Sequence, residues 1–250
     1  MSLPVHLVPT LAGVAIGDAV TVDGDEAHHA VAVRRLRVGE AVVLTDGAGA
    51  AVTGEVAETG KRVFTVTVAA RRDQAEPTPR VTVVQALPKG ERGELAVEVL
   101  TEIGAARIVP WAASRSVAIW KGERAEKSLA KWRSTAREAA KQARRAHFPQ
   151  VVPMAATADV ADLIAHAGDR AVAVVLHEEG SQRLGDVALP GGLAELIVVV
   201  GPEGGLAPEE IDAFETAGAV TVRLGTEVLR TSTAGLAAVS ALLARTPRWA

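Results

Sequence analysis

The sequence predicts two domains, a small β-rich barrel followed by a larger α/β domain. Before residue 72, short stretches alternate apolar and polar residues, as half-buried strands do. Beyond residue 81, unbroken apolar runs alternate with helical stretches, which is the pattern of a parallel sheet covered by helices. A polar segment with two prolines separates the two patterns. We therefore expect domains at 1–72 and 81–250, joined by a linker at 73–80.

Composition favours a globular chain and excludes several classes of protein. The 250 residues can form two hydrophobic cores, and 48% of them are hydrophobic. Without cysteine there are no disulfides or thiolate metal sites, and His28 and His29 lack a third ligand nearby, so we expect no metal. No apolar run approaches the roughly 18 residues of a membrane span, and no signal-peptide pattern is present, so we expect a cytoplasmic protein without a membrane partner. The net charge of −3 means that nucleic-acid affinity must come from a local patch.

In the predicted barrel, segments of alternating polarity are the expected strands. They cover residues 19–22, 41–45, 51–56 and 62–68. Asp25 is the expected N-cap of a short helix at 27–36. Basic residues gather around this helix, namely His28, His29, Arg34, Arg35 and Arg37. A phosphate-contacting patch and a solvated helix end are both open interpretations of this cluster.

In the α/β domain, apolar runs mark the strands. They cover residues 81–87, 107–111, 172–176, 196–200 and 220–224. A charged loop at 88–92 leads into a helix that ends at Ile103, with Gly104 in the C-cap position. The last helix is expected at 234–244, with Thr231 or Ser232 as its N-cap.

A long helix is expected at 125–147, with an apolar face and a basic face. Its apolar stripe consists of Leu129, Trp132, Ala136, Ala139, Ala140 and Ala143. Its cations recur at three- and four-residue steps: Arg133, Arg137, Lys141, Arg144 and Arg145. Pairing with Glu126 and Glu138 would make this an ordinary solvated face. Because the cations at 137–145 exceed what a helix C-terminus attracts, we favour a phosphate-binding face.

The strongest functional signal is a strand, a glycine-rich turn and a helix start at 196–210. A buried apolar run is followed by Gly201, Pro202, Glu203, Gly204 and Gly205, and Pro208 then marks a helix start. This order is typical of a ligand site at the carboxyl end of a parallel strand, although a tight turn without a ligand has the same residues. Two further strand ends, at 177–179 and 224–230, are expected to converge on the same pocket. Their loops offer mainly backbone groups, which suits a ligand recognised by shape and hydrogen-bonding edge, such as adenine.

Common catalytic motifs are missing from the chain. There is no P-loop and no dinucleotide-binding glycine motif, so neither ATP hydrolysis nor a Rossmann cofactor site has a fingerprint. The nucleophile elbow of hydrolases and the two-histidine motif of zinc proteases are also absent.

Several short motifs, in this order and spacing, resemble one known family. They are the run 201–205 after a buried strand, Leu224 with Gly225, and Leu229, Arg230 and Thr231 at the start of the last helix. Outside the pocket they are His28 with Arg34, Arg35 and Gly39; residues 101–104 before Pro110; and residues 138–142 with Arg144 and Arg145. Together they resemble the SPOUT methyltransferases, and more narrowly the ribosomal RNA small-subunit methyltransferase E family, over nearly the whole chain.

This resemblance implies a PUA-like barrel, a SPOUT-type parallel sheet with a C-terminal trefoil knot, and a homodimer. It implies S-adenosylmethionine as methyl donor and N3 of a uridine in 16S rRNA, free or in the small ribosomal subunit, as acceptor. Ribose 2′-O-methylation and a non-catalytic ribosome-assembly factor are the alternatives. Ser232 stands where the family often has glutamate, so this chain has no carboxylate at that position.

The expected site residues come from the converging strand ends, the basic clusters and the matched motifs. The cofactor residues are Leu176, His177, Glu178, Gly201, Pro202, Glu203, Gly204, Gly205, Leu224, Gly225, Leu229 and Thr231. The RNA-binding residues are Arg34, Arg35, Arg137, Lys141, Arg144 and Arg145. Arg230 is the expected catalytic residue, because a cation can stabilise the uridine anion that forms when N3 loses its proton; a salt bridge to Glu203 or Glu227 is its alternative role. His177, Glu178 and Glu203 are the candidates for the general base.

Overall fold

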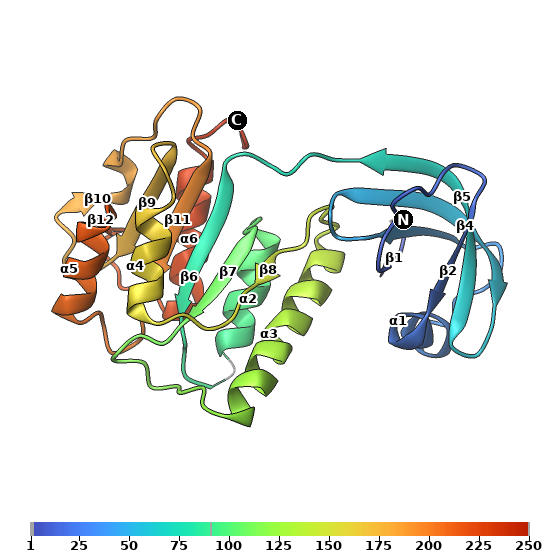
Figure 1. Ribbon diagram of the computed structural model, residues 1–250, viewed down its shortest axis with the longest axis horizontal. Helices are drawn as coiled ribbons and strands as arrows, with labels where there is room; N and C mark the ends of the chain where they lie inside the picture. Colours follow the sequence, from blue (N-terminus) through green and yellow to red (C-terminus); the bar gives the residue numbers. More distant parts are fainter. Residues whose placement is uncertain (1–2, 91, 250) are drawn as a thin grey trace. The chain divides into compact units, whose positions relative to one another are not determined.

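The computed structural model describes residues 3–90 and 92–249, and internal contacts group them into two units (Figure 1). The first unit contains the chain up to Glu76 and also the segment Ala140–Phe148; the second contains the remainder. The end of the first stretch, at Glu76, falls inside the predicted linker at 73–80. The ends of the predicted domains at residues 1, 2 and 250, and residue 91 of the predicted loop, lie outside the described residues.

The first unit is built on a five-stranded sheet in the order β1-β3-β4-β5-β2. Its strands are β1 (Val5–Leu7), β2 (Ala19–Asp23), β3 (Ala41–Thr45), β4 (Ala50–Thr59) and β5 (Val63–Asp73). All neighbours are antiparallel except β1 and β3. The predicted strands are confirmed, while β1 and the full lengths of β4 and β5 were not predicted. Alternate residues of the curled sheet face inward and form one core, which includes Leu44, Phe64 and Val66.

The helical part of the first unit starts earlier than predicted. It consists of α1 (Gly24–His28) and a π-helical turn, η1 (His29–Val33). Asp25 lies inside α1 and does not cap it; its carboxylate accepts a hydrogen bond from Arg62 at 2.6 Å. The predicted capping role of Asp25 is therefore wrong, because the chain turns into the helix two residues earlier.

The segment Ala140–Phe148 joins the first unit at the turn between β3 and β4. The Phe148 amide donates to the Gly47 carbonyl at 2.8 Å, and the Gly49 amide donates to Ala146 at 2.9 Å. Gly47 has φ +69°, and a Cβ there would lie 2.9 Å from the Phe148 ring. Glycine is therefore required at this turn both for the backbone conformation and for the close approach of the segment.

The second unit is an α/β domain with a seven-stranded parallel sheet in the order β10-β12-β9-β11-β6-β7-β8. The strands are β6 (Arg80–Ala86), β7 (Arg107–Trp111), β8 (Gln150–Val151), β9 (Ala171–Leu176), β10 (Gln182–Arg183), β11 (Glu195–Val200) and β12 (Val220–Arg223). The apolar runs that predicted β6, β7, β9, β11 and β12 are confirmed. The two-residue strands β8 and β10 are too short to give a periodic signal.

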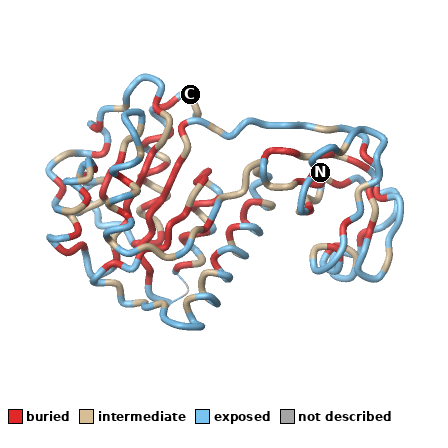
Figure 2. Tube along the Cα trace, in the orientation of Figure 1, coloured by how far each residue is buried: buried red, intermediate tan, exposed pale blue. Residues whose placement is uncertain are grey.

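Helices cover both faces of this sheet, so its central strands are buried (Figure 2). One core combines alternate residues of β6 and β11 with residues of α2 (Arg92–Glu102), α3 (Glu123–Gln142) and α6 (Thr231–Leu243). The opposite core includes residues of α4 (Thr157–Ala165) and α5 (Pro208–Thr216). A strand buried on both faces has no polar alternation, which explains the unbroken apolar run of β11.

Helix α3 ends five residues before the predicted end at 147. Gln142 is its last residue, and Arg144 adopts a left-handed conformation with φ +53°. The predicted apolar stripe is buried or half-buried up to Ala140, whereas Ala143 is exposed because it lies past the helix. The cations Arg144 and Arg145 therefore lie in the turn after α3 and not on its basic face.

Helix α6 begins three residues before the predicted start at 234. Arg230 takes the N-cap position through its backbone, and Thr231 and Ser232 are buried in the first turn. The predicted cap by a Thr231 or Ser232 side chain is therefore wrong. On β6, the Gln85 amide donates to the Thr231 carbonyl at 3.3 Å and so holds this end of α6.

Candidate functional site

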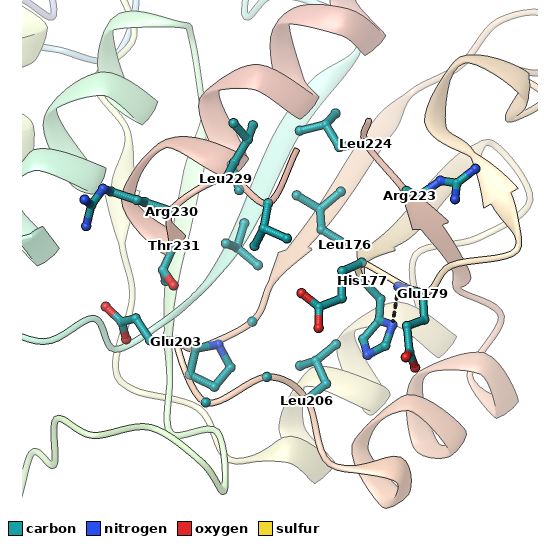
Figure 3. Close-up of a pocket in the computed structure, with 18 of the residues that line it drawn as sticks. Leu176, His177, Glu179, Glu203, Leu206, Arg223, Leu224, Leu229, Arg230 and Thr231 are labelled. Atoms are coloured by element: carbon teal, nitrogen blue, oxygen red, sulfur yellow. Dashed lines mark hydrogen bonds between the residues drawn. The ribbon is translucent and has the colours of Figure 1, made fainter. Parts of the chain in front are cut away.

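A cavity of about 1020 Å³ lies in the second unit, at the carboxyl ends of β9, β11 and β12 (Figure 3). These strands are consecutive neighbours in the sheet, so the loops that follow them open on the same edge. All the predicted cofactor residues line the cavity, and so does Arg230. The convergence expected from three strand ends is therefore what the sheet order produces.

Leucine side chains give one part of the cavity an apolar wall. In Figure 3, Leu176, Leu224 and Leu229 lie on one side of it, and Leu206 lies opposite. The remaining lining comes largely from the glycine-rich loop 201–205 and from acidic and arginine side chains. Apolar walls with a few polar groups are typical of pockets for small organic ligands.

The glycines of the loop after β11 serve different purposes. Gly205 has φ +74°, a conformation that residues with a side chain rarely adopt. Gly204 packs against Arg115, because a Cβ on Gly204 would lie 2.8 Å from the Arg115 carbonyl oxygen. Glycine at 204 therefore allows close approach of the Arg115 backbone, and Gly204 also lines the cavity.

Two residues that we did not assign to the site, Arg115 and Glu210, form hydrogen bonds that fix the segments next to this loop. The Arg115 guanidinium donates to the Leu206 carbonyl at 3.0 Å. Glu210 is only 4% exposed, and its carboxylate accepts from the amides of Ser114 at 2.8 Å and Ala207 at 3.0 Å. The segment after β7 and the start of α5 are thereby fixed to each other beside the cavity. Their separation of about ninety residues in the sequence hid this connection.

His177 forms a small turn at the end of β9. The amide of Glu179 donates to His177 Nδ1 at 3.1 Å, and the amide of Gly180 donates to the His177 carbonyl at 3.2 Å. Glu178 is exposed at the same turn. On the glycine-rich loop, Glu203 is also exposed and accepts a hydrogen bond from the Lys89 amide at 3.2 Å.

Arg230 lies at the edge of the cavity with an exposed side chain. Figure 3 shows its guanidinium pointing away from the leucine wall. Within residues 3–90 and 92–249, no ion pair joins it to Glu203 or Glu227. Glu227 accepts instead from the Thr226 hydroxyl at 2.8 Å. The alternative role of Arg230, as a salt bridge that braces the loop, therefore has no support in the described residues.

The predicted RNA-binding cations differ in their exposure, in their partners and in the unit to which they belong. Lys141 is only 11% exposed and donates to both oxygens of Glu26, at 3.1 and 3.2 Å, so its charge is paired with a carboxylate. Arg34, Arg35 and Arg144 are exposed in the first unit. Arg137, in the second unit, is exposed and lies 4.0 Å from Glu138. Arg145 is half-buried and does make an interaction of its own.

Glu26 is the centre of a polar cluster in the first unit. It accepts hydrogen bonds from His6 Nδ1 at 3.3 Å and from Lys141. Burial by itself would raise the pKa of Glu26, but the hydrogen bond from His6 and the charge and hydrogen bond of Lys141 lower the pKa from 4.5 to about 2. Glu26 is therefore ionised at neutral pH and neutralises Lys141.

Among the described residues, no cluster of three or more histidine, aspartate or glutamate side chains is arranged to hold a metal ion. None of the helices in this part of the chain is both long enough and apolar enough to cross a membrane.

Comparisons with protein-family models show the class of protein to which the chain belongs. A family model described as an RNA methyltransferase domain matches residues 74–243, and a model described as an RNA methyltransferase PUA domain matches residues 22–69. Together with the parallel sheet and the curled sheet of the first unit, these matches give an α/β SPOUT fold preceded by a PUA-like unit.

Individual relatives narrow the class. The chain is 46% identical to a ribosomal RNA small subunit methyltransferase E of Mycobacterium bovis over 93% of this chain and 89% of the relative. It is 31% identical to the Bacillus subtilis protein of that name over 89% of this chain and 88% of the relative. A structure of the Neisseria gonorrhoeae protein of that name, bound to S-adenosyl methionine, superposes with a TM-score of 0.87 at 26% identity over 98% of both chains. The chain therefore belongs to the ribosomal RNA small subunit methyltransferase E family, as its motif order indicated.

Proposed function

We propose that the chain transfers a methyl group from S-adenosylmethionine to N3 of a uridine in 16S rRNA. The observation that carries this proposal is the cavity at three neighbouring strand ends, lined by all residues of the motifs at 201–205, 224–225 and 229–231. The 46% identity to a small-subunit rRNA methyltransferase over 93% of the chain supports the rRNA substrate. The N3 position rests on the family resemblance, and ribose 2′-O-methylation is not favoured.

The cavity fits the cofactor in size and chemistry. Its volume of about 1020 Å³ is at the upper end of the roughly 300–1000 Å³ usual for small-molecule pockets. The leucine wall suits a flat purine, and the backbone of 201–205 and 224–225 offers hydrogen-bonding groups beside it. The nucleoside part of S-adenosylmethionine would be held by Leu176, His177, Leu224 and Leu229. The glycine-rich loop would hold the remainder of the cofactor. When bound, S-adenosylmethionine supplies an electrophilic methyl group on a sulfonium.

The chain's own contribution to the reaction is to orient the uracil and to favour its deprotonated form. Neutral uracil N3 has no free lone pair in the ring plane, so the N3 proton must leave. Arg230 is exposed at the cavity edge and has no carboxylate partner among the described residues, so its charge is available to the uracil O2 and O4 atoms. The amino end of α6 begins at the next residue and adds partial positive charge there. Glu178 and Glu203 remain the carboxylate candidates for the base.

We also propose that the chain forms a homodimer. Its proposed partner is the small ribosomal subunit or the 16S rRNA. Beside the cavity, Val228 is 75% exposed and Leu229 is 41% exposed. An apolar loop at the edge of a site is stabilised when a second surface covers it. The cytoplasm, where rRNA is matured, is the location that this substrate implies. The trefoil knot stays a prediction from the resemblance.

Methyl transfer to RNA tests the proposed function directly. Purified protein is incubated with tritium-labelled S-adenosylmethionine and either 16S rRNA or small subunits from a strain lacking the enzyme, and the RNA is digested to nucleosides. We expect the label in 3-methyluridine. Label in a 2′-O-methyl nucleoside would favour the ribose alternative, and no label in either substrate would favour a non-catalytic assembly factor.

A further inference from the structure

The position of His177 at the cavity wall is fixed by its backbone. The His177 amide donates to the Val222 carbonyl of β12 at 2.9 Å, and its carbonyl accepts from Gly180. Gly180 lies so close to β12 that a Cβ there would be 2.5 Å from the Val222 carbonyl carbon. The backbone of the turn after β9 is therefore held against the neighbouring strand.

The hydrogen bond inside this turn determines which ring nitrogen carries the proton. A backbone amide can only donate, so His177 Nδ1 must accept from the Glu179 amide at 3.1 Å. In the neutral imidazole, the proton is then on Nε2. We infer that His177 presents Nε2–H as a hydrogen-bond donor to an acceptor atom of the bound methyl donor, a role that rests on the proposed function.

The surroundings of the ring favour a ligand as the partner of Nε2. Figure 3 shows the ring at the cavity between Leu206 and Glu179. Within the described part of the chain, Nε2 has no hydrogen-bond partner. A ligand that displaces water from the ring must supply an acceptor, because a desolvated donor left unpaired weakens binding. The unprotonated ring nitrogens and the oxygens of S-adenosylmethionine are acceptors of this kind.

The same geometry removes His177 from the candidates for the general base. A neutral ring with its proton on Nε2 takes up a second proton at Nδ1. That atom faces the Glu179 amide, so protonation would replace an attractive contact by two opposed N–H groups. His177 is thus a ligand-orienting donor, and the base must be another group.

Two near-isosteric variants distinguish the donor role of Nε2 from the role of Nδ1 in the turn. In His177→Asn the side-chain oxygen can take the position of Nδ1 and preserve the turn, as asparagine commonly does in such turns. In His177→Gln the amide nitrogen can reach the position of Nε2 and preserve the donor. Calorimetry with S-adenosylhomocysteine should give a dissociation constant for His177→Gln within about threefold of the wild type. His177→Asn should bind about 3- to 10-fold more weakly, the size of one neutral hydrogen bond.

A result in which His177→Gln binds no more tightly than His177→Asn overturns the donor role. A wild-type protein that does not bind S-adenosylhomocysteine contradicts the proposed function instead. Nitrogen-15 NMR of the wild type provides a second test, and His177→Gln identifies the signal by its loss. We expect an unprotonated Nδ1 and a protonated Nε2 in the neutral imidazole of His177; the reverse tautomer also overturns the inference.

Discussion

The proposed catalytic role of Arg230 rests on the surroundings of this residue. It lies between the exposed loop 224–229 and the first turn of α6, and no carboxylate neutralises it among the described residues. A cation that is free of protein partners at the edge of a ligand cavity is available to the substrate. Its contribution should therefore appear in the transition state and not in cofactor binding.

Arg230→Ala should lower methyl transfer by a factor on the order of 100, while the affinity for S-adenosylhomocysteine stays nearly constant. Single-turnover methylation and calorimetry measure the two quantities separately. Arg170→Ala is the matched control, because Arg170 is exposed and lies outside the cavity, just before β9. Wild-type turnover in Arg230→Ala would exclude the catalytic role, and a parallel loss of rate and affinity would favour a bracing role.

Glu26 makes a pH-dependent contribution to stability in the first unit. Its folded-state pKa of about 2 is lower than the ordinary value of 4.5, so the contribution is complete above pH 4.5 and is lost as the pH falls toward 2. At pH 7, Glu26→Gln should lower the free energy of unfolding by about 1–3 kcal/mol, less than at a fully buried pair because Glu26 is partly exposed.

Urea denaturation of the wild type and Glu26→Gln across this pH range tests that contribution. The difference between them should shrink as the pH falls from 4.5 toward 2, because the wild type alone loses the charged interaction. Glu58→Gln, on the exposed end of β4, is the control and should change little. Parallel loss of stability in the wild type and Glu26→Gln would contradict the assignment.

The elements around β11 show what a sequence can predict about a site. The apolar run of β11, the glycines after it and Pro208 at the start of α5 are local signals, and each was confirmed. Convergence of three loops followed from the rule that parallel strands end at one edge. The contacts of Arg115 and Glu210 were not predictable, because they join segments about ninety residues apart with no periodic signal.

Helix α3 shows the opposite case. Residues 139–146 include alanine, lysine, glutamine and arginine, which all favour helix, so the local signal predicts that the helix continues. The chain instead leaves the helix at Gln142, and Ala146 and Phe148 bond to the turn at Gly47 and Gly49. Tertiary contacts therefore override the local helix propensity of these residues. As a result, Arg144 and Arg145 lie outside the helix, and Lys141 is neutralised by Glu26.

The glycine-rich loop should depend on its packing against Arg115. Gly204→Ala places a methyl group 2.8 Å from the Arg115 carbonyl, so the loop must move and the affinity for S-adenosylhomocysteine should fall about tenfold. Gly191→Ala is the matched control, since a Cβ there meets nothing within 4 Å and its φ is not left-handed. Unchanged affinity in Gly204→Ala, measured by calorimetry, would show that the loop tolerates the shift.

For the whole molecule, the proposed RNA surface rests on arginines that remain exposed. Arg34→Ala combined with Arg144→Ala should weaken RNA binding and flatten its salt dependence by about 0.7–0.9 log units of slope per lost contact. Filter binding at several salt concentrations measures this slope, with Arg170→Ala as control. An unaltered salt slope in the double variant would show that Arg34 and Arg144 are ordinary solvated residues that do not contact RNA.

The proposed homodimer is tested on the unmodified chain. Light scattering at micromolar concentration should give twice the mass of one chain, because the exposed Val228 and Leu229 are stabilised by a covering surface. Val228→Asp introduces a charge at this surface and should shift the equilibrium toward monomer. A monomeric wild type under these conditions would contradict the assembly.

The most direct test of the proposed function is mass spectrometry of digested 16S rRNA from a strain that lacks this protein. We predict that one 3-methyluridine present in the parent strain is missing. It should return when the wild-type chain is expressed, and it should return far more slowly with Arg230→Ala. An unchanged content of 3-methyluridine in the deletion strain, with every other modification also intact, would contradict the account.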